Sequence, residues 1–200
     1  MFTETYNAAG NRLTEATQYA TTVFTYNAAN RLTNVGASTY QWDANGNLLS
    51  TGAYTGTYNA ANQLVTLTTA SGLTYTYAYN GLGDRVKQTI NGVVTTYTLD
   101  LNAGLTQVLA DGTNAYLYGL SRIAQQNTSS TDYFLPDALG SVRQLANVST
   151  TVTLARNYDP YGNVLSSAGY RSTSYNFTGE LRDSGTGLLY TSALVTMQTA

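Results

Sequence analysis

The stretch Tyr6-Asn7-Ala8-Ala9-Gly10-Asn11-Arg12-Leu13 contains the pattern from which the fold can be predicted. Its aromatic–Asn pair recurs as an aromatic residue followed by Asn or Asp, at Tyr26-Asn27, Trp42-Asp43, Tyr58-Asn59, Tyr79-Asn80 and Tyr158-Asp159. The position four residues after each aromatic is always Gly or Asn, namely Gly10, Asn30, Gly46, Asn62, Gly83 and Gly162. Gly and Asn enter the left-handed backbone region at low steric cost, so we expect a corner with positive φ there. The Asn or Asp side chain can bond forward to backbone amides. Together these features predict a repeated hairpin turn of about four residues.

The segments beside these turns have the composition of strands. Residues 63–68 and 74–79 alternate Thr, Tyr, Val and Leu, and Asn91-Gly92 is a strong signal for a two-residue hairpin. Helical periodicity is hard to find. The sequence therefore predicts an all-β fold, in which repetitive antiparallel hairpins form a curved, open β-sheet.

Composition excludes several classes of function. The 200 residues are 42% apolar but only 10% charged, with a net charge of −2. The cations stand singly along the chain, which does not favour phosphate binding: Arg12, Arg31, Arg85, Lys87, Arg122, Arg143, Arg156, Arg171 and Arg182. We therefore expect no nucleic-acid partner.

The absence of Cys and His removes the thiolate nucleophile, the imidazole base and the usual zinc ligands. No metal and no cofactor is expected. The sequence contains no apolar run of about 20 residues, so we expect no membrane span. Residues 1–20 lack the basic start and apolar region of a signal peptide.

The repeated aromatic residues allow two interpretations. They could form a platform that binds sugars or bases, or they could stack on one another across the strands. Stacking is the simpler interpretation for a residue that recurs in every repeat. Arg12, Arg31 and Arg85 follow their turns, and we expect them on a solvated face.

Three of the turn units resemble the YD repeats of RHS proteins: Tyr6–Leu13, Tyr26–Leu32 and Trp42–Leu49. Three later motifs resemble the start of the RHS-associated core domain, in the order expected for it: Asp137–Arg143, Tyr158–Val164 and Phe177–Tyr190. We therefore divide the chain into a YD-repeat hairpin array (1–125), the start of a core-like region (126–190) and an atypical tail (191–200).

The resemblance implies a hollow β-shell that, in bacterial polymorphic toxins, encloses a variable C-terminal toxin domain. It also implies secretion or display at the cell surface. After Gly187-Leu188-Leu189-Tyr190, the family's Arg-Ala-Arg-Tyr-Tyr-like stretch is replaced by Thr191-Ser192-Ala193-Leu194. This replacement suggests a truncated or frameshifted reading frame. The family's proteolytic aspartates lie beyond this point, so no catalytic residue is carried over.

Size limits what the chain can do alone. Six to seven hairpins correspond to about 12 to 14 strands and roughly 60 to 65 Å of sheet, at about 4.8 Å per strand. Encircling a guest of about 130 residues takes well over 100 Å of sheet. The expected partners are therefore the rest of a larger shell or an enclosed toxin domain, and open sheet edges favour self-association.

Paired carboxylates would be the most plausible basis for an enzyme of this composition. The candidates in the core-like half are Asp132, Asp137, Asp159, Glu180 and Asp183. Asp137 and Asp159 occupy turn positions, while Glu180 and Asp183 flank Arg182 and could form simple ion pairs. We therefore expect a structural, non-catalytic wall segment of a shell. The alternative is an adhesion module that binds glycans or proteins through exposed aromatic residues.

Overall fold

The computed structural model describes residues 3–183, 185–191 and 194–196, and its regular structure is all β except for one short 3₁₀ helix. Most of the atypical tail, at 192–193 and 197–200, lies outside the described residues. The chain divides into two compact units, Met1–Thr76 and Tyr77–Ala200, and the division falls inside one strand, β10 (Thr74–Tyr79). The predicted all-β fold of antiparallel hairpins is confirmed.

Strands follow one another in sequence order within every sheet, as in a meander. The first sheet contains β1 (Thr3–Tyr6), β2 (Arg12–Ala16), β3 (Thr21–Tyr26), β4 (Leu32–Val35) and β5 (Ser38–Thr39). The second contains β6 (Gln41–Trp42), β7 (Leu48–Ser50), β8 (Tyr54–Tyr58), β9 (Leu64–Thr69), β10, β11 (Arg85–Ile90) and β12 (Val93–Thr96).

The remaining strands lie in the second unit. An eight-stranded sheet contains β13 (Thr98–Asp100), β14 (Gln107–Ala110), β15 (Ala115–Tyr118), β16 (Arg122–Gln126), β17 (Thr131–Pro136), β18 (Val142–Asn147), β19 (Val152–Tyr158) and β20 (Val164–Gly169). A small sheet follows the 3₁₀ helix η1 (Phe177–Gly179) and contains β21 (Leu181–Arg182), β22 (Leu189–Thr191) and β23 (Leu194–Thr196). These strands outnumber the roughly 12 to 14 expected, because many hairpins after residue 91 lack the aromatic–Asn pair.

The repeated turns share one hydrogen-bonding scheme. In the first, the backbone N–H of Asn7 donates to the carbonyl of Asn11 at 2.9 Å, and that of Gly10 donates back to the carbonyl of Asn7 at 3.0 Å. The Asn7 side-chain oxygen accepts the N–H groups of Ala9 and Asn11 at 3.0 and 2.9 Å. The backbone φ is positive at all six Gly or Asn corners: Gly10, Asn30, Gly46, Asn62, Gly83 and Gly162.

The turn at Asp137 is built in the same way although Pro136 replaces the aromatic residue. The N–H of Asp137 donates to the carbonyl of Ser141 at 3.0 Å, and Gly140 has a φ of 86°. The aromatic residue is therefore not required for the turn itself.

Repeat aromatics connect neighbouring hairpins mainly by hydrogen bonds. The indole N–H of Trp42 donates to the carbonyl of Leu32 at 2.7 Å, and the hydroxyl of Tyr58 donates to that of Leu48 at 3.0 Å. These hydrogen bonds are contacts that the expectation of stacking did not include. A half-buried indole or phenol needs a partner for its polar group, and a backbone carbonyl supplies it.

The expected solvated face for the arginines is also wrong. Arg12 is buried because its guanidinium lies 4.1 Å from the centre of the Phe24 ring and pairs with the carboxylates of Glu4 and Glu15 at 3.0 and 2.6 Å. Arg31 is half-buried, and its side chain donates to the carbonyl of Asp43 at 3.1 Å. Aromatic faces and carbonyl groups replace the water that would otherwise solvate these cations.

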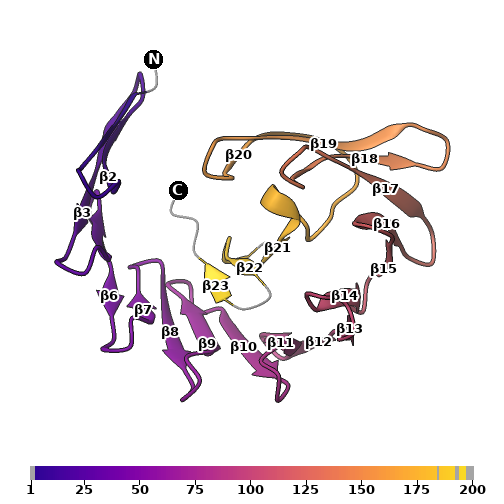
Figure 1. Cartoon of the computed structure of the whole chain (residues 1–200), viewed down its shortest axis with the longest axis horizontal. Helices are drawn as coiled ribbons and strands as arrows, with labels where there is room; N and C mark the ends of the chain where they lie inside the picture. The colour runs from indigo at the N-terminus through magenta and orange to yellow at the C-terminus, as the bar shows by residue number, and fades with distance from the viewer. Residues whose placement is uncertain (1–2, 184, 192–193, 197–200) are drawn as a thin grey trace. The chain divides into compact units, whose positions relative to one another are not determined.

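In the second unit, the eight-stranded sheet curves around the small sheet and η1, which lie on its concave side (Figure 1). The buried core lies between the two and comprises Tyr97, Tyr116, Phe134, Val142, Leu145, Leu154, Tyr175 and Leu181. Tyr175 from the inner segment meets the rings of Tyr116 and Phe134 edge-on, with centroids 4.9 and 6.2 Å apart. Such pairs contribute about 0.5–1.5 kcal/mol each beyond burial. This core fixes residues 170–191, here called the inner segment, against the sheet.

Candidate functional site

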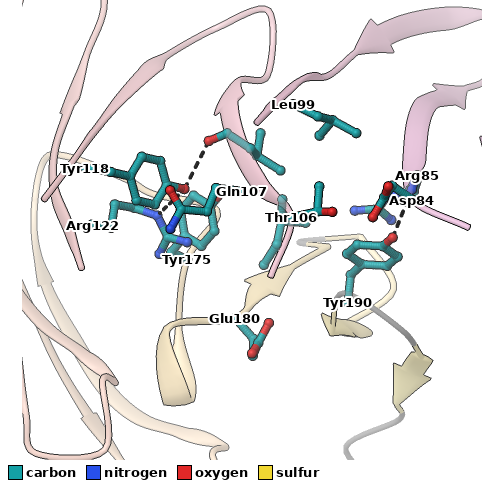
Figure 2. A pocket seen from close by; sticks show the side chains of 12 residues that line it. Asp84, Arg85, Leu99, Thr106, Gln107, Tyr118, Arg122, Tyr175, Glu180 and Tyr190 are labelled. Atoms are coloured by element: carbon teal, nitrogen blue, oxygen red, sulfur yellow. Dashed lines mark hydrogen bonds between the residues drawn. The ribbon is translucent and has the colours of Figure 1, made fainter. Parts of the chain in front are cut away.

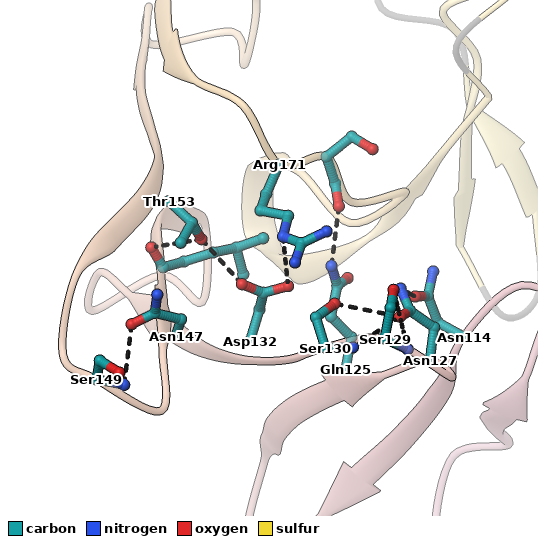
Figure 3. Close-up of polar contacts among 12 residues, drawn as sticks. Asn114, Gln125, Asn127, Ser129, Ser130, Asp132, Asn147, Ser149, Thr153 and Arg171 are labelled. Atoms are coloured by element: carbon teal, nitrogen blue, oxygen red, sulfur yellow. Dashed lines mark hydrogen bonds and ion pairs between the residues drawn. The ribbon is translucent and has the colours of Figure 1, made fainter.

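The inner segment begins where the chain leaves β20. The carbonyl of Thr153 on β19 accepts the N–H groups of Tyr170 and Arg171 at 3.0 and 3.1 Å, which turns the chain inward after Gly169. Gln125 then donates its side-chain amide to the carbonyl of Ser172 at 2.8 Å. These contacts tie the start of the inner segment to the sheet (Figure 3).

Asp132 is the buried carboxylate of this region. Its Oδ1 accepts the Thr153 hydroxyl at 3.0 Å, and its Oδ2 lies 3.6 Å from Nε of Arg171 (Figure 3). This sequence candidate for acid–base chemistry therefore contacts an arginine and a hydroxyl instead of a second carboxylate.

Arg122 on β16 holds the middle of the inner segment. Its guanidinium lies over the Tyr175 ring, 3.1 Å from the centroid, and donates to the carbonyl of Gly179 at 3.0 Å. The same group donates through Nε to the hydroxyl of Tyr118 at 3.2 Å. Arg122 thus contacts Tyr118 of the eight-stranded sheet and Tyr175 of the inner segment.

The Tyr175–Gly179 turn has the aromatic–Asn spacing and the backbone bonds of a repeat unit, which the sequence analysis did not include, although the Asn176 side-chain oxygen accepts from Arg156 and not from the turn amides. Tyr175-Asn176 is an aromatic–Asn pair with Gly179 four residues after the aromatic. The N–H of Asn176 donates to the carbonyl of Glu180 at 3.0 Å, and the N–H of Gly179 donates to that of Asn176 at 3.2 Å. The signal in the sequence is the aromatic–Asn pair followed by Gly four residues after the aromatic residue, which also occurs in the C-terminal region.

Arg85 on β11 contacts the end of the inner segment. Its guanidinium lies 4.1 Å from the Tyr190 ring centroid and 5.1 Å from that of Tyr97, while its backbone N–H donates to the Tyr190 hydroxyl at 2.9 Å. Only 5% of Arg85 is exposed, so the expected solvated position is wrong here too. Three aromatic faces, the third belonging to Tyr77, surround this cation.

Asp183 connects the inner segment to β11 through a second contact. Its Oδ2 accepts the Gln88 side-chain amide at 2.6 Å, and Gln88 in turn accepts the Tyr97 hydroxyl at 2.8 Å. Its Oδ1 accepts the N–H groups of Gly185 and Thr186 at 3.0 and 2.8 Å. The expected ion pair with Arg182 is therefore wrong, because amide donors already occupy both carboxylate oxygens.

The other candidate carboxylates lie apart from these contacts. Asp137 and Asp159 each accept backbone N–H groups within their own turns, from Leu139 and Ser141 and from Tyr161 and Asn163. Glu180 lines a cavity instead. Burial raises the pKa of Glu180, and the charge of Arg122 acts in the opposite direction. The five candidates are therefore spread over several turns, and no hydrogen bond or ion pair joins two of them within the described residues.

A cavity of about 80 Å³ lies between β11, β13–β16 and the inner segment (Figure 2). Arg85, Arg122, Glu180 and Asp84 bring charge to it. Its other lining residues are Leu99, Thr106, Gln107, Val108, Tyr118, Tyr175, Leu181 and Tyr190. The cavity has room for a few water molecules or one small polar group.

The described part of the chain contains no group of three or more His, Cys, Asp or Glu side chains placed to hold a metal ion. It also contains no helix that is long and apolar enough to cross a membrane.

Hairpins with one turn scheme and a C-terminal segment packed on the concave side of a sheet characterise the second unit. The family model described as Teneurin YD-shell matches residues 3–194. The chain belongs to the Teneurin YD-shell family. The sequence-based resemblance to YD-repeat proteins is thereby confirmed.

Among curated proteins, this YD-shell chain is similar to the tRNA3(Ser)-specific nuclease WapA of Bacillus spizizenii, with 32% identity. It is also similar to the tRNA nuclease WapA of Bacillus subtilis strain 168, with 33% identity. Each alignment covers 93% of this chain and 9% of the relative, so the chain spans about a tenth of their length.

Among solved structures, the YD-shell chain is similar to one described as "Crystal Structure of TcdB2-TccC3-TEV", with a TM-score of 0.72 and 18% identity. The match covers 96% of this chain and 11% of that one. At this identity, the likeness establishes the fold alone.

Proposed function

We propose that this chain is a structural, non-catalytic wall segment of a YD-repeat shell that encloses a C-terminal toxin domain. The observation that carries the proposal is the inner segment, which is held by Arg122 of the eight-stranded sheet and by Arg85 and Gln88 on β11 of the neighbouring sheet. Because the inner segment covers the concave side of the sheet, that side is better suited to face the inside of a shell than to bind a partner as an open surface. The names of the WapA relatives as tRNA nucleases agree with a toxin on the same polypeptide in those proteins.

The proposed partners are the rest of a larger shell and the enclosed domain, and the proposed location is outside the cell or at its surface. We also propose the three-part organisation stated above: hairpin array (1–125), core-like start (126–190) and tail (191–200). In this scheme the Asn or Asp and the Gly or Asn of each repeat turn act structurally.

An adhesion module is the second candidate function. It would require a strip of exposed aromatic side chains. The exposed tyrosines include Tyr6, Tyr19, Tyr133 and Tyr170, which lie on different strands and turns. Tyr75, Tyr77, Tyr97, Tyr116 and Tyr175 are buried. This distribution favours the wall.

The test of the wall proposal is size-exclusion chromatography with light scattering on residues 1–200 over a range of concentrations. Strand β20 pairs with β19 and ends its sheet, and most of its side chains are exposed. A free strand edge pairs readily with additional sheet, and a lysine there opposes pairing. We therefore expect concentration-dependent association that Leu165→Lys on β20 reduces.

Leu139→Lys is the matched control, because Leu139 and Leu165 are both 68% exposed but Leu139 lies in a turn. It should leave the association unchanged. A monomer at every concentration would count against the wall segment and for a self-contained module. Equal effects of the two lysines would show that association does not use the β20 edge.

A further inference from the structure

The cavity of the second unit contains a buried cation with unusual surroundings. Arg85 is 5% exposed, and no acceptor among the described residues bonds its Nε. No carboxylate oxygen in the described part lies within 4.0 Å of its side-chain nitrogens. Its neighbours are the faces of Tyr77, Tyr97 and Tyr190. Aromatic faces stabilise a cation, but they do not accept the directional N–H bonds of a guanidinium.

A second guanidinium faces the same cavity. Arg122 uses one terminal nitrogen for the carbonyl of Gly179 and its Nε for Tyr118, and it forms no ion pair within 4.0 Å in the described residues. Figure 2 shows Arg122 and Arg85 on opposite sides of the cavity, approaching from β16 and β11. Planar guanidinium groups bind carboxylates and other oxyanions through paired N–H donors.

Two carboxylates also face this space. Asp84 already accepts the side-chain amide of Asn80 at 3.0 Å. Glu180 comes from the inner segment and faces the cavity (Figure 2). Its carboxylate forms no ion pair within 4.0 Å among the described residues. Its negative charge opposes the entry of any other anion. The cavity therefore has the donors of an oxyanion site and one resident carboxylate that weakens it.

We propose that this cavity binds a small oxyanion between Arg85 and Arg122. The site goes beyond the proposed wall function. The oxyanion would be either the carboxylate of an acidic side chain from an adjoining polypeptide or a free inorganic anion. At about 80 Å³ the cavity admits a group of this size and little more.

The test follows the guanidinium N–H signals of the full chain by NMR. Sulfate stands for a free inorganic anion and acetate for an acidic side chain, with sodium chloride holding the ionic strength constant. We expect the Arg85 and Arg122 Nε–H signals to shift and saturate. Glu180→Gln keeps the shape of the side chain and removes its charge. It should tighten binding tenfold or more, as expected for removing one unit charge within about 12 Å of the anion at an effective dielectric constant near 20.

Lys87→Gln is the control, because Lys87 lies on β11 but its side chain is exposed. It removes one cation from the same strand and should leave the binding constant unchanged. If Lys87→Gln weakened binding by the same factor by which Glu180→Gln tightened it, the effect would belong to general surface charge and the proposal would be overturned. So would the absence of a saturable shift with both anions in both the natural chain and Glu180→Gln.

A pH series separates the cavity from weaker surface binding. Asp84, Arg85, Arg122 and Glu180 are the charged groups that face the anion, together with the hydroxyls of Tyr118, Tyr175 and Tyr190. Because burial raises the pKa of Glu180, lowering the pH until this carboxyl is protonated should strengthen sulfate binding in the natural chain and leave Glu180→Gln nearly unchanged. The same pH response in both proteins would contradict the proposal. Saturation by acetate supports a side-chain source, and saturation by sulfate alone supports an inorganic one.

Discussion

Asp43 shows how one residue of a repeat turn acts on stability. Its carboxylate accepts the side-chain amide and the backbone N–H of Asn47, both at 2.8 Å. These bonds lower the pKa of Asp43, the side-chain bond most strongly. A lowered folded-state pKa means that Asp43 stabilises the fold above its unfolded-state pKa of about 3.9, and that this contribution is lost as the pH falls through the folded-state value. Asn at this position cannot be protonated in that range.

We therefore predict that Asp43→Asn removes part of the loss of stability in acid. The turn should form, because Asn stands at the same position in the repeats at Asn7, Asn27 and Asn59. The urea midpoint of Asp43→Asn should lie below that of the natural chain at pH 7, where the carboxylate is ionised, and the two midpoints should converge as the pH falls toward 2.5 and the carboxylate is protonated. The reciprocal change Asn59→Asp should add acid sensitivity. Parallel pH curves for all three proteins would refute this role for the carboxylate.

Asp183 is a single side chain that connects distant parts of the second unit. Removing it by Asp183→Ala leaves the Gln88 amide and the N–H groups of Gly185 and Thr186 without their acceptor. The buried Gln88 amide left unsatisfied costs about 1–3 kcal/mol, and the two half-buried turn amides, which water can partly reach, cost less, so we predict a loss of roughly 2–4 kcal/mol. Hydrogen exchange should become faster at the described amides of residues 185–191.

The control for this prediction is Asp159→Ala. Asp159 accepts the same kind of turn bonds, from Tyr161 and Asn163, without a bond to a distant side chain. Its loss of stability should be smaller, and exchange in residues 185–191 should stay unchanged. If both alanine variants lose equal stability, the Gln88–Asp183 bond does not contribute as the structure indicates.

Among the elements, β20 is the one at which the chain leaves the sheet for the interior. A Cβ added to Gly169, its last residue, would lie 2.2 Å from the carbonyl oxygen of Thr153. That carbonyl holds the N–H groups of Tyr170 and Arg171. Gly169 also has a φ of 114°. Both steric space and backbone conformation therefore require glycine at this turn.

We predict that Gly169→Ala costs roughly 3 kcal/mol, combining backbone strain with overpacking. Gly46→Ala is the comparison, because Gly46 has a φ of 88° but no heavy atom within 4 Å of the added Cβ. Its cost should be about 1 kcal/mol, from strain alone. Urea unfolding measures both, and exchange at the Tyr170 and Arg171 amides tests the location. Similar costs for the two variants would mean that the Thr153 contact relaxes readily.

The elements differ in how far the sequence could predict them. Repeat turns are local: Asn7 and Gly10 bond within five residues, so composition and spacing were sufficient to predict the all-β hairpins. The inner segment depends on contacts such as Arg85 with Tyr190, which are 105 residues apart. No local pattern encodes such a contact. The burial of Arg85 was missed for the same reason, since its aromatic neighbours come from β10, from the chain before β13 and from β22.

The candidate site was only partly visible in the sequence. The sequence identifies Glu180 and Asp183 as candidate carboxylates, but it does not predict which residues lie beside them. The Tyr175–Gly179 turn was present in the pattern and could have been found. The cavity itself arises from packing between the inner segment and several strands. Its charged side chains come close to one another only when those elements have folded together.

At the scale of the whole molecule, the chain comprises two compact units with different interiors. The second contains the cluster of Tyr97, Tyr116, Phe134 and Tyr175 with its aliphatic neighbours, and contacts from the inner segment. The first buries Phe24, Leu48, Leu64, Leu67 and Tyr75 among short hairpins. Buried apolar area is the main source of stability. We therefore expect the first unit to unfold more easily than the second.

Trp42 provides a selective probe of that difference, because it is the single tryptophan and lies in the first unit. Its fluorescence should report unfolding of residues 1–76, whereas far-ultraviolet circular dichroism reports both units. We predict a fluorescence midpoint lower than the final circular dichroism transition by about 1 M urea. This is the separation expected when stabilities differ by a few kcal/mol and unfolding depends on urea with a slope of 1–3 kcal/mol/M. Asp183→Ala should move the later transition toward lower urea and leave the Trp42 midpoint in place. If the two transitions coincide and Asp183→Ala shifts both of them, the chain unfolds as one cooperative unit. The hairpins before β10 would then depend for their stability on the core that holds the inner segment.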